Sequence, residues 1–516
     1  MTLQRGGTKA LCCTGALLTI TLSACAVGPN FHSPARPTQN GYTREALPGQ
    51  TASTGVTGPG GETQRFEPGA DLPGQWWTLF GSAKLDALLR QAMVNYPDIA
   101  AQQAALREAR ENARAEKGNF LPQVQGLGLA ERFQRSGAEV FPGFPNFIED
   151  LFEATVNVSY TFDLFGKERR TVEGLQAQAL QQSFVLEASY LKLTSDVVSA
   201  AIQVATVRGQ IAATQQLIDI DQHELSIVQR RFQLGSQTRA DVLQQQTNLA
   251  NVRAQLPPLQ QKLAQAQHQL AVLTGRSPAD TTPLELELSD LKLPQELPVS
   301  LPSSLVAQRP DIRQQTALMH EMSANIGVAT ANMLPQLNLT ATSLGNASTQ
   351  AASLAEASAG VWGIGGQITA PLFEGGALRA KRRAAIDAYD QAFAQYRLAV
   401  LQAFQAVADA LTALQNDAQA LKAQRDALDA AQSSLDLSQR QYAVGAVDQV
   451  TLLQAQQSYQ STRLNYVQAL ANRYGDTVTL FAALGGGWWN RHDPGTTAEL
   501  TSAAFVTKVP APRSQR

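Results

Sequence analysis

Groups that usually carry chemistry are scarce in this sequence of 516 residues. It has three cysteines and five histidines, and the histidines are scattered along the chain. His320-Glu321 is not followed by a second histidine at the spacing of a zinc protease. No phosphate-binding loop and no Gly-x-Ser-x-Gly motif occurs. We therefore expect no enzyme, no catalytic residue, no metal site and no cofactor.

Charge and long apolar runs are also sparse. Charged residues make up 16% of the chain and the formal net charge is −2, so no basic face for a nucleic-acid partner is expected. No uninterrupted apolar run reaches the roughly 18 residues that a spanning helix needs.

The N-terminus has the pattern of a targeting segment. Basic residues precede the short apolar stretch Leu11–Leu22, and Leu22-Ser23-Ala24-Cys25 follows. This predicts a signal peptide over residues 1–24 and lipidation of Cys25, as in bacterial lipoproteins. The alternative is a plain signal peptide that ends near an incidental cysteine. The other two cysteines would leave with the signal, so the mature chain can form no internal disulfide, which suits an oxidising compartment.

The main feature that is present is a long heptad pattern. Nine positions repeat every seven residues, with no Pro or Gly between them, and they predict one supercoiled helix of about 85 Å. The positions are Ile386, Phe393, Val400, Val407, Leu414, Leu421, Leu428, Leu435 and Tyr442.

The same helix occurs twice. Gly445 follows the first pattern, and Gly235 lies 210 positions earlier, after a matching heptad series from Tyr190 to Phe232. A second apolar series follows each glycine, beginning at Val242 and at Leu452. The chain is therefore predicted to be a duplicated, very long helical hairpin. A fibrous coiled coil is the alternative.

The duplication extends upstream, where the pattern changes to a period of two. Pro97-Asp98-Ile99 and Pro310-Asp311-Ile312 are offset by 213 positions. Each copy then shows alternating apolar and polar residues that predict two strands, with a poorer match at Leu127 to Phe133. The strands are around residues 127–133, 154–162, 337–342 and 362–370.

Four such strands are long enough to cross a bilayer when tilted. Open edges are not tolerated in lipid, so other copies must close the sheet. Two chains give eight strands and three give twelve. The alternative is a small soluble sheet with its apolar face on a helix. The basic residues that follow each strand pair, such as Arg170 and Arg383, either contact lipid head groups or are ordinary solvated helix starts.

These patterns predict an ordered set of segments. They are a signal peptide at 1–24, a lipidated N-terminal strap at 25–80, repeat one at 81–275, a linker at 276–302, repeat two at 303–485 and a loose C-terminal tail at 486–516. Pro257-Pro258 falls inside the first returning helix, where a kink or local break is expected.

The combination of motifs resembles the outer-membrane efflux proteins, the TolC-like channel family, and most closely the lipoprotein branch of drug-efflux factors (OprM/NodT-like). The residues that carry the resemblance are Cys25 with Val27-Gly28-Pro29-Asn30-Phe31, Trp76-Trp77 with Phe80, Tyr160 to Arg170, Arg309-Pro310-Asp311-Ile312, Phe404 with Val407-Ala408-Asp409-Ala410-Leu411, and Ala483-Leu484-Gly485-Gly486-Gly487-Trp488.

The resemblance implies a mainly α fold with a small β part. Three chains would form a homotrimer with an α-helical tunnel and a twelve-stranded transmembrane β-barrel, four strands per chain. The implied partners are a periplasmic adaptor (membrane fusion protein), an inner-membrane pump of RND type and outer-membrane lipid. The implied function is the outer-membrane conduit of a tripartite efflux pump for small molecules. A conduit for type I polypeptide secretion or metal efflux is the alternative, and a periplasmic structural coiled coil is an alternative of another class.

The resemblance also suggests site residues at the ends of the hairpins. Gly235, Thr238, Gly445 and Asp448 are expected to contact the adaptor, although they are also consistent with simple turns. Many relatives carry charged residues shortly after the second tip glycine, where this chain has Gln454 and Gln457. We therefore expect a gate held by apolar residues and glutamines, with Asp448 either in a carboxylate ring or acting as a helix N-cap. The apolar gate residues are Val447, Val450 and Leu453.

Overall fold

The computed structural model describes residues 26–39, 41–45, 47–53, 60–139, 141–280 and 284–491. The predicted signal peptide, Cys25 and residues 492–516 lie outside the described residues. The chain divides into two compact units, which we describe separately. The first contains residues up to 34, 104–183 and 314–397, and the second contains residues 35–103, 184–313 and 398 onward.

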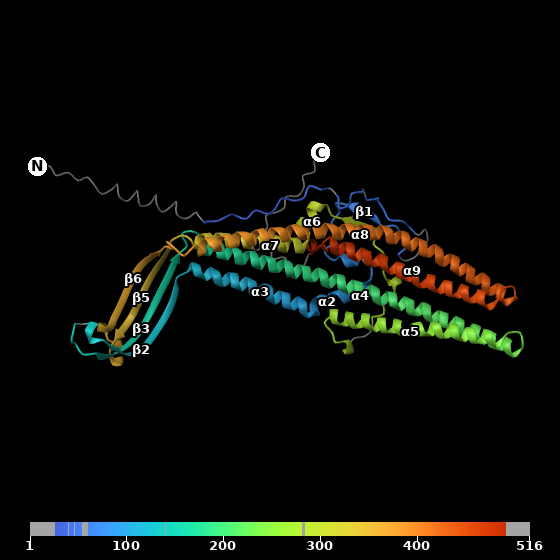
Figure 1. Ribbon diagram of the computed structural model, residues 1–516, viewed down its shortest axis with the longest axis horizontal. Coiled ribbons are helices and arrows are strands. Elements are labelled where there is room, and N and C mark those ends of the chain that lie inside the picture. Colours follow the sequence, from blue (N-terminus) through green and yellow to red (C-terminus); the bar gives the residue numbers. More distant parts are fainter. Residues whose placement is uncertain are drawn as a thin grey trace. The chain divides into compact units, whose positions relative to one another are not determined.

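The helical hairpins are duplicated as predicted (Figure 1). Helix α4 (Lys167–Gln233) is followed by α5 (Arg239–Leu273), and α8 (Ala377–Ala443) is followed by α9 (Gln449–Ala483). Both long helices have 67 residues and both returning helices have 35. The corresponding helices begin 210 positions apart, so the two hairpins match residue for residue.

The elements upstream of each hairpin are duplicated too. Helix α3 (Pro97–Lys117) corresponds to α7 (Pro310–Ala331), and strand β2 (Gln123–Arg135) corresponds to β5 (Gln336–Ser348). Strand β3 (Phe147–Phe162) corresponds to β6 (Gly360–Thr369). Each pair begins 213 positions apart, which is the offset that the sequence predicts.

The first unit contains one antiparallel sheet with strand order β2-β3-β5-β6 (Figure 1). Among the described residues, β2 and β6 each have a partner on one side only. Apolar side chains on β6 are open to solvent in the single chain, since Trp362, Ile364 and Ile368 are 77%, 76% and 71% exposed. No helix among the described residues covers this face, which disfavours a small soluble sheet packed on a helix.

The core of the second unit includes all four hairpin helices. Leu217 and Ile218 from α4 pack with Leu249 from α5, Leu435 from α8 and Tyr459 from α9, and all five are at most 8% exposed. The predicted heptad positions from Val407 to Tyr442 are buried or partly buried here. Burial of this seam is the main reason that such long helices are stable, since helix propensity alone contributes little.

Short elements surround these helices. Strand β1 (Arg65–Pro68) pairs in parallel with β4 (Glu296–Val299), and the remaining helices of this unit are α2 (Ala83–Asn95) and α6 (Pro302–Gln308). The predicted linker 276–302 is therefore partly ordered, because it contains β4 and several buried leucines. These leucines are Leu286, Leu288, Leu291, Leu293 and Leu297.

The two prolines in α5 do not break it. The helix runs without interruption from Arg239 to Leu273 with Pro257 and Pro258 inside it. Both prolines are exposed, so the carbonyl groups that lose a helical donor can bond water. Val252, one turn earlier, is buried in the core and holds the helix in register. The expected local break is therefore wrong, and the alternative of a kink stays a prediction.

Among the described residues, one helix, α8, is long and apolar enough to cross a membrane by length and composition alone.

Candidate functional site: the hairpin tips

Each tip is closed by the same backbone motif. At the first tip, the Ser236 N–H donates to the Arg231 carbonyl (2.9 Å) and the Gly235 N–H donates to the Phe232 carbonyl (2.9 Å). This is a Schellman motif, which requires a left-handed residue after the helix. Gly235 supplies it with φ +76°.

The second tip repeats this geometry. The Ala446 N–H donates to the Gln441 carbonyl (2.8 Å), the Gly445 N–H donates to the Tyr442 carbonyl (3.1 Å), and Gly445 also has φ +76°. A Cβ at either glycine would meet no atom within 4 Å. Glycine is therefore required for its backbone conformation and not for lack of space.

The returning helices begin at different caps. Thr238 caps α5 in a capping box with Asp241, whose N–H donates to the Thr238 hydroxyl (3.2 Å). Asp448 caps α9 and accepts from the Thr451 N–H (2.9 Å) and from its hydroxyl (2.7 Å). These hydrogen bonds hold the pKa of Asp448 below its usual value. The carboxylate thus has the N-cap role that the sequence left open.

The two tips are joined through Tyr442. Its hydroxyl accepts from the Gln237 amide (3.1 Å), and the Arg231 guanidinium lies 5.0 Å from the ring centroid. Tyr442 is 6% exposed. The contacts couple the end of α8 to the turn of the first hairpin, so a movement of one tip changes the packing of the other.

The structure separates the predicted gate residues into two groups. Val450, Gln454 and Gln457 are exposed at helical spacing on one face of α9. Leu453 is only 5% exposed and Val447 packs against the helical core. Val447 and Leu453 therefore stabilise the hairpins of their own chain, and the exposed stripe of α9 is Val450 with the two glutamines.

A buried polar layer lies just inside the tips. The Asn248 amide donates to the Asp221 carboxylate (3.0 Å), and the Gln449 amide donates to the Gln245 side-chain oxygen (3.4 Å). Burial raises the pKa of Asp221 to about 6, and the neighbouring Glu224 carboxylate adds to this rise. Polar groups at core positions weaken helix packing and fix its register. Sequence reasoning did not find this layer, because glutamines are common throughout these helices.

A second constellation that the sequence did not reveal lies in the first unit. Arg170, Glu173, His320 and Gly327 hold the start of the strap, and we call them the strap dock. The Arg170 side chain is 5% exposed. It donates to the Val27 carbonyl (3.2 Å), to the Asn30 side chain (2.8 Å) and to Glu173 (2.7 Å).

The other contacts of the strap dock are an aromatic ring stack and a close approach of two backbone segments. The His320 ring stacks on Phe31 with centroids 4.7 Å apart, and its Nε2 lies 2.8 Å from a Glu173 oxygen. Gly28 approaches Gly327 so closely that a Cβ on Gly28 would lie 2.5 Å from the Gly327 Cα. Ala26, the first described residue, therefore has a fixed place beside the corner between β3 and α4. The sequence showed His320 only as one of several scattered histidines.

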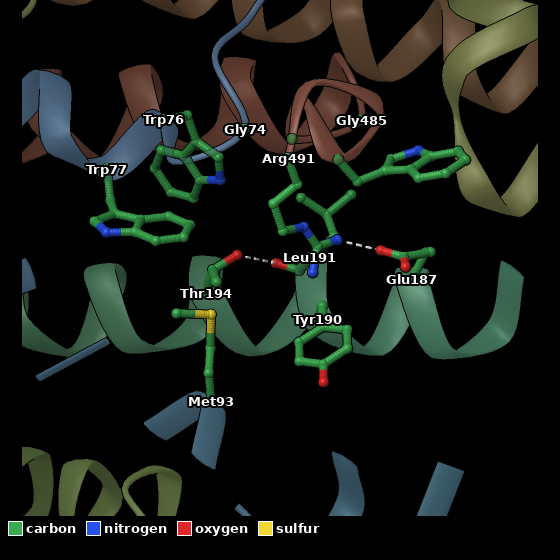
Figure 2. A pocket seen from close by; sticks show the side chains of 12 residues that line it. Gly74, Trp76, Trp77, Met93, Glu187, Tyr190, Leu191, Thr194, Gly485 and Arg491 are labelled. Atoms are coloured by element: carbon green, nitrogen blue, oxygen red, sulfur yellow. Dashed lines mark hydrogen bonds and ion pairs between the residues drawn. The ribbon is translucent and has the colours of Figure 1, made fainter. Parts of the chain in front are cut away.

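The segment after α9 is fixed in the second unit (Figure 2). Arg491 forms an ion pair with the buried Glu187 of α4 and lies 5.0 Å from the Tyr190 ring centroid. Trp488 donates to the Gln308 carbonyl (2.7 Å). Trp76 and Leu191 line the small cavity beside these groups. The predicted tail is therefore ordered as far as Arg491, and this cavity brings together no pair of groups suited to catalysis.

Among the described residues, no group of three or more His, Cys, Asp or Glu side chains is placed to hold a metal ion. The hairpin tips themselves are two hydrogen-bonded turns with exposed side chains.

Comparison with known proteins gives a consistent result. A family model described as "Outer membrane efflux protein" matches residues 88–276 and 301–486. The pyoverdine export outer membrane protein OpmQ of Pseudomonas aeruginosa is 31% identical over 80% of this chain and 87% of that protein. The toluene efflux pump outer membrane protein TtgC of Pseudomonas putida is 28% identical over 92% of this chain and 95% of that protein.

Solved structures share the fold at lower identity. The outer-membrane channel OprN has a TM-score of 0.79 at 23% identity, covering 90% of this chain and all of that one. The CmeC outer membrane channel of Campylobacter jejuni has a TM-score of 0.79 at 20% identity, covering 93% of this chain and 98% of that one.

Proposed function

The chain belongs to the outer membrane efflux protein family, and on that premise we propose that three copies form a passive conduit through the outer membrane into the periplasm. The observation that carries this proposal is the sheet β2-β3-β5-β6 with its two open edges. Unpaired edge groups are costly in lipid, so other copies must pair with them. Eight strands from two copies would be filled by side chains, whereas twelve from three copies leave a water path.

The tips are the proposed contact with a periplasmic adaptor (membrane fusion protein), which in turn joins an inner-membrane pump of RND type. Three copies present six tips, with Gly235 and Thr238 on one kind and Gly445 and Asp448 on the other. The pump would supply energy and choose the cargo. The names of the relatives favour small molecules as cargo, since they mention pyoverdine export and toluene efflux. Metal efflux or polypeptide secretion would use the same conduit with another pump.

We also propose the segment boundaries given by the sequence, with repeat one at 81–275 and repeat two at 303–485, and lipidation of Cys25. Cys25→Ser should abolish incorporation of labelled fatty acid, while the sheet still inserts because the lipid is not its only hold on the membrane.

One experiment tests the conduit. The protein is chemically crosslinked in membranes to count its chains. It is then purified and reconstituted in a planar bilayer to measure conductance. We expect crosslinking to stop at three chains and the trimer to conduct ions. A ladder that ends at two chains, or a stable monomer with no conductance, would contradict the proposal and favour a structural coiled coil.

A further inference from the structure

The strap dock has an equivalent position in the second repeat that no strap can fill. The dock lies between α4 and α7, where Glu173 and His320 meet. In the first unit, α3 also contacts α4 through Glu116 and Glu168, and Arg382 of α8 donates to Thr330 of α7 (3.3 Å). The helix order is therefore α3-α4-α7-α8, parallel to the strand order.

In a closed ring of copies, α8 must then lie beside α3 of the next copy, as β6 lies beside its β2. The groove between α8 and that α3 is the repeat equivalent of the groove between α4 and α7. Each chain has one N-terminus, so a trimer has six such grooves and three straps. Three grooves, each between two copies, remain without a strap.

The two kinds of groove differ in charge. The offsets of 210 and 213 give the equivalent positions in the other repeat. Ala380 corresponds to Arg170, Arg383 to Glu173, Arg107 to His320 and Arg114 to Gly327. The dock pairs one arginine with one carboxylate and is close to neutral. The groove between copies instead gathers three arginines.

These arginines are available for a ligand. All three are exposed in the single chain. Arg114 bonds Glu111 at 2.6 Å, whereas Arg107 and Arg383 form no ion pair within the described ranges 60–139, 141–280 and 284–491. Guanidinium groups match phosphate oxygens in geometry as well as in charge.

The neighbouring corner adds an apolar surface. In repeat one, the strap covers the corner, where the Val27 N–H donates to the Phe165 carbonyl (2.9 Å). In repeat two, the corresponding Leu372 and Phe373 are 96% and 89% exposed. The corner directly follows β6, whose apolar face is also exposed, so acyl chains can lie along both.

Building on the proposed trimer, we propose that this groove binds an anionic phospholipid of the leaflet that faces the helices. Arg107 of one copy and Arg383 of the next hold its phosphate, and Leu372 and Phe373 contact its acyl chains. The lipid takes the place that the strap occupies in the equivalent groove. The charge difference between the grooves selects an anionic head group over a zwitterionic one.

Native mass spectrometry of delipidated trimers tests this inference. The trimers are titrated with phosphatidylglycerol and, separately, with phosphatidylcholine of the same acyl chains. We expect up to three phosphatidylglycerol molecules per trimer, bound about tenfold more tightly than phosphatidylcholine. Arg107→Ala with Arg383→Ala should weaken phosphatidylglycerol binding about tenfold or more. The matched control, Arg253→Ala with Lys262→Ala, removes two exposed charges from α5 and should leave binding unchanged.

The outcomes separate the two proposals. Wild-type trimers without a preference for the anionic lipid, or a double variant that binds as wild type does, would overturn the lipid site and leave the conduit standing. A spectrum of monomers only would overturn both. If the double variant does not assemble, Arg383→Glu decides the question. It restores the carboxylate that repeat one carries at Glu173, and it should weaken phosphatidylglycerol binding alone.

Discussion

At the residue scale, one pair of carboxylates makes the second hairpin sensitive to pH. Asp476 of α9 lies within hydrogen-bonding reach of Asp417 of α8, and burial together with this neighbour raises the pKa of Asp476 to about 7. One Asp476 oxygen is buried without a donor. Two carboxylates bond each other only if one is protonated. The corresponding residues of repeat one are the buried Val207 and Ala266.

The sign of the pH effect follows from this shift. Between about pH 4 and pH 7 the folded chain holds a proton that the unfolded chain has released, so stability falls as pH rises through this range and is level above it. Asp476→Asn should reduce the fall and raise the thermal stability at pH 8 relative to wild type, while Asp221, whose pKa is also raised, keeps its own part of the fall. Thermal melts from pH 5 to pH 8 measure it. Asp436→Asn, an exposed change on α8, is the control, and an unchanged slope in Asp476→Asn would contradict the prediction.

Residue roles were the least predictable from sequence. Val447, Val450 and Leu453 all look suitable for an apolar constriction, but Val450 is exposed whereas Leu453, three residues further along α9, is buried. The packing of Val447 depends on a core cluster that includes Tyr442 and Leu452, contacts that the local pattern does not specify. The dock residue Arg170 looked like one of several basic residues at a helix start, because its partners Val27 and Asn30 are far away in sequence.

At the scale of elements, each hairpin tip needs a glycine with a left-handed backbone conformation, although a side chain at that position would have room. A non-glycine residue in the left-handed region costs roughly 1–2 kcal/mol, and a β-branched residue tolerates it least. Gly445→Val should distort the second tip and lower efflux while the trimer yield stays normal. Gly445→Asn should retain more activity, because asparagine adopts this conformation more readily.

Efflux is measured as drug resistance restored to a strain without its own outer-membrane channel, and trimer yield is measured by crosslinking. Equal loss of efflux and trimer in Gly445→Val would show that the turn serves folding alone. Gly235→Val gives the same comparison for the first tip.

The strap is an element whose position depends on two glycines. Gly28 has φ +93° and lies against Gly327, so Gly28→Ala meets backbone atoms that cannot give way. We expect this variant to release the start of the strap and to speed cleavage by the broad-specificity protease proteinase K within residues 28–39. Gly49→Ala, in the same strap, meets nothing within 4 Å and serves as the control. Cleavage at the wild-type rate in Gly28→Ala would contradict the dock as the strap's main hold.

The elements themselves were largely predictable, and the exceptions have physical causes. The heptads and the constant offsets predicted all four hairpin helices, because a long buried seam repeats its apolar positions at a fixed sevenfold period. The alternation of apolar and polar residues was weak in strand β2, because glycines stand at two alternate positions, Gly126 and Gly128. In the structure, Leu127 between them is 43% exposed. The order in residues 276–302 was missed, since a strand as short as β4 depends on its distant partner β1.

At the scale of the whole molecule, the exposed stripe of α9 bears on conduction. If the second hairpin lines the constriction of the trimer, Gln454 contributes one amide from each copy. Gln454→Asp would then place three carboxylates in a ring, where like charges in a narrow, poorly solvated space bind cations strongly. Single-channel recordings in a planar bilayer should show new cation selectivity and block by multivalent cations.

Two further variants serve as comparisons for the Gln454→Asp recordings. Gln244→Asp makes the same change at the matching exposed position of the first hairpin and should leave conductance unchanged, because only the second hairpin is expected at the constriction. Asp448→Asn keeps a side chain that can cap α9 and should change selectivity little, since the Asp448 carboxylate is occupied by Thr451. If Gln454→Asp changes neither selectivity nor block, position 454 faces away from the water path. Selectivity that responds to Gln244→Asp instead would place the constriction on the first hairpin.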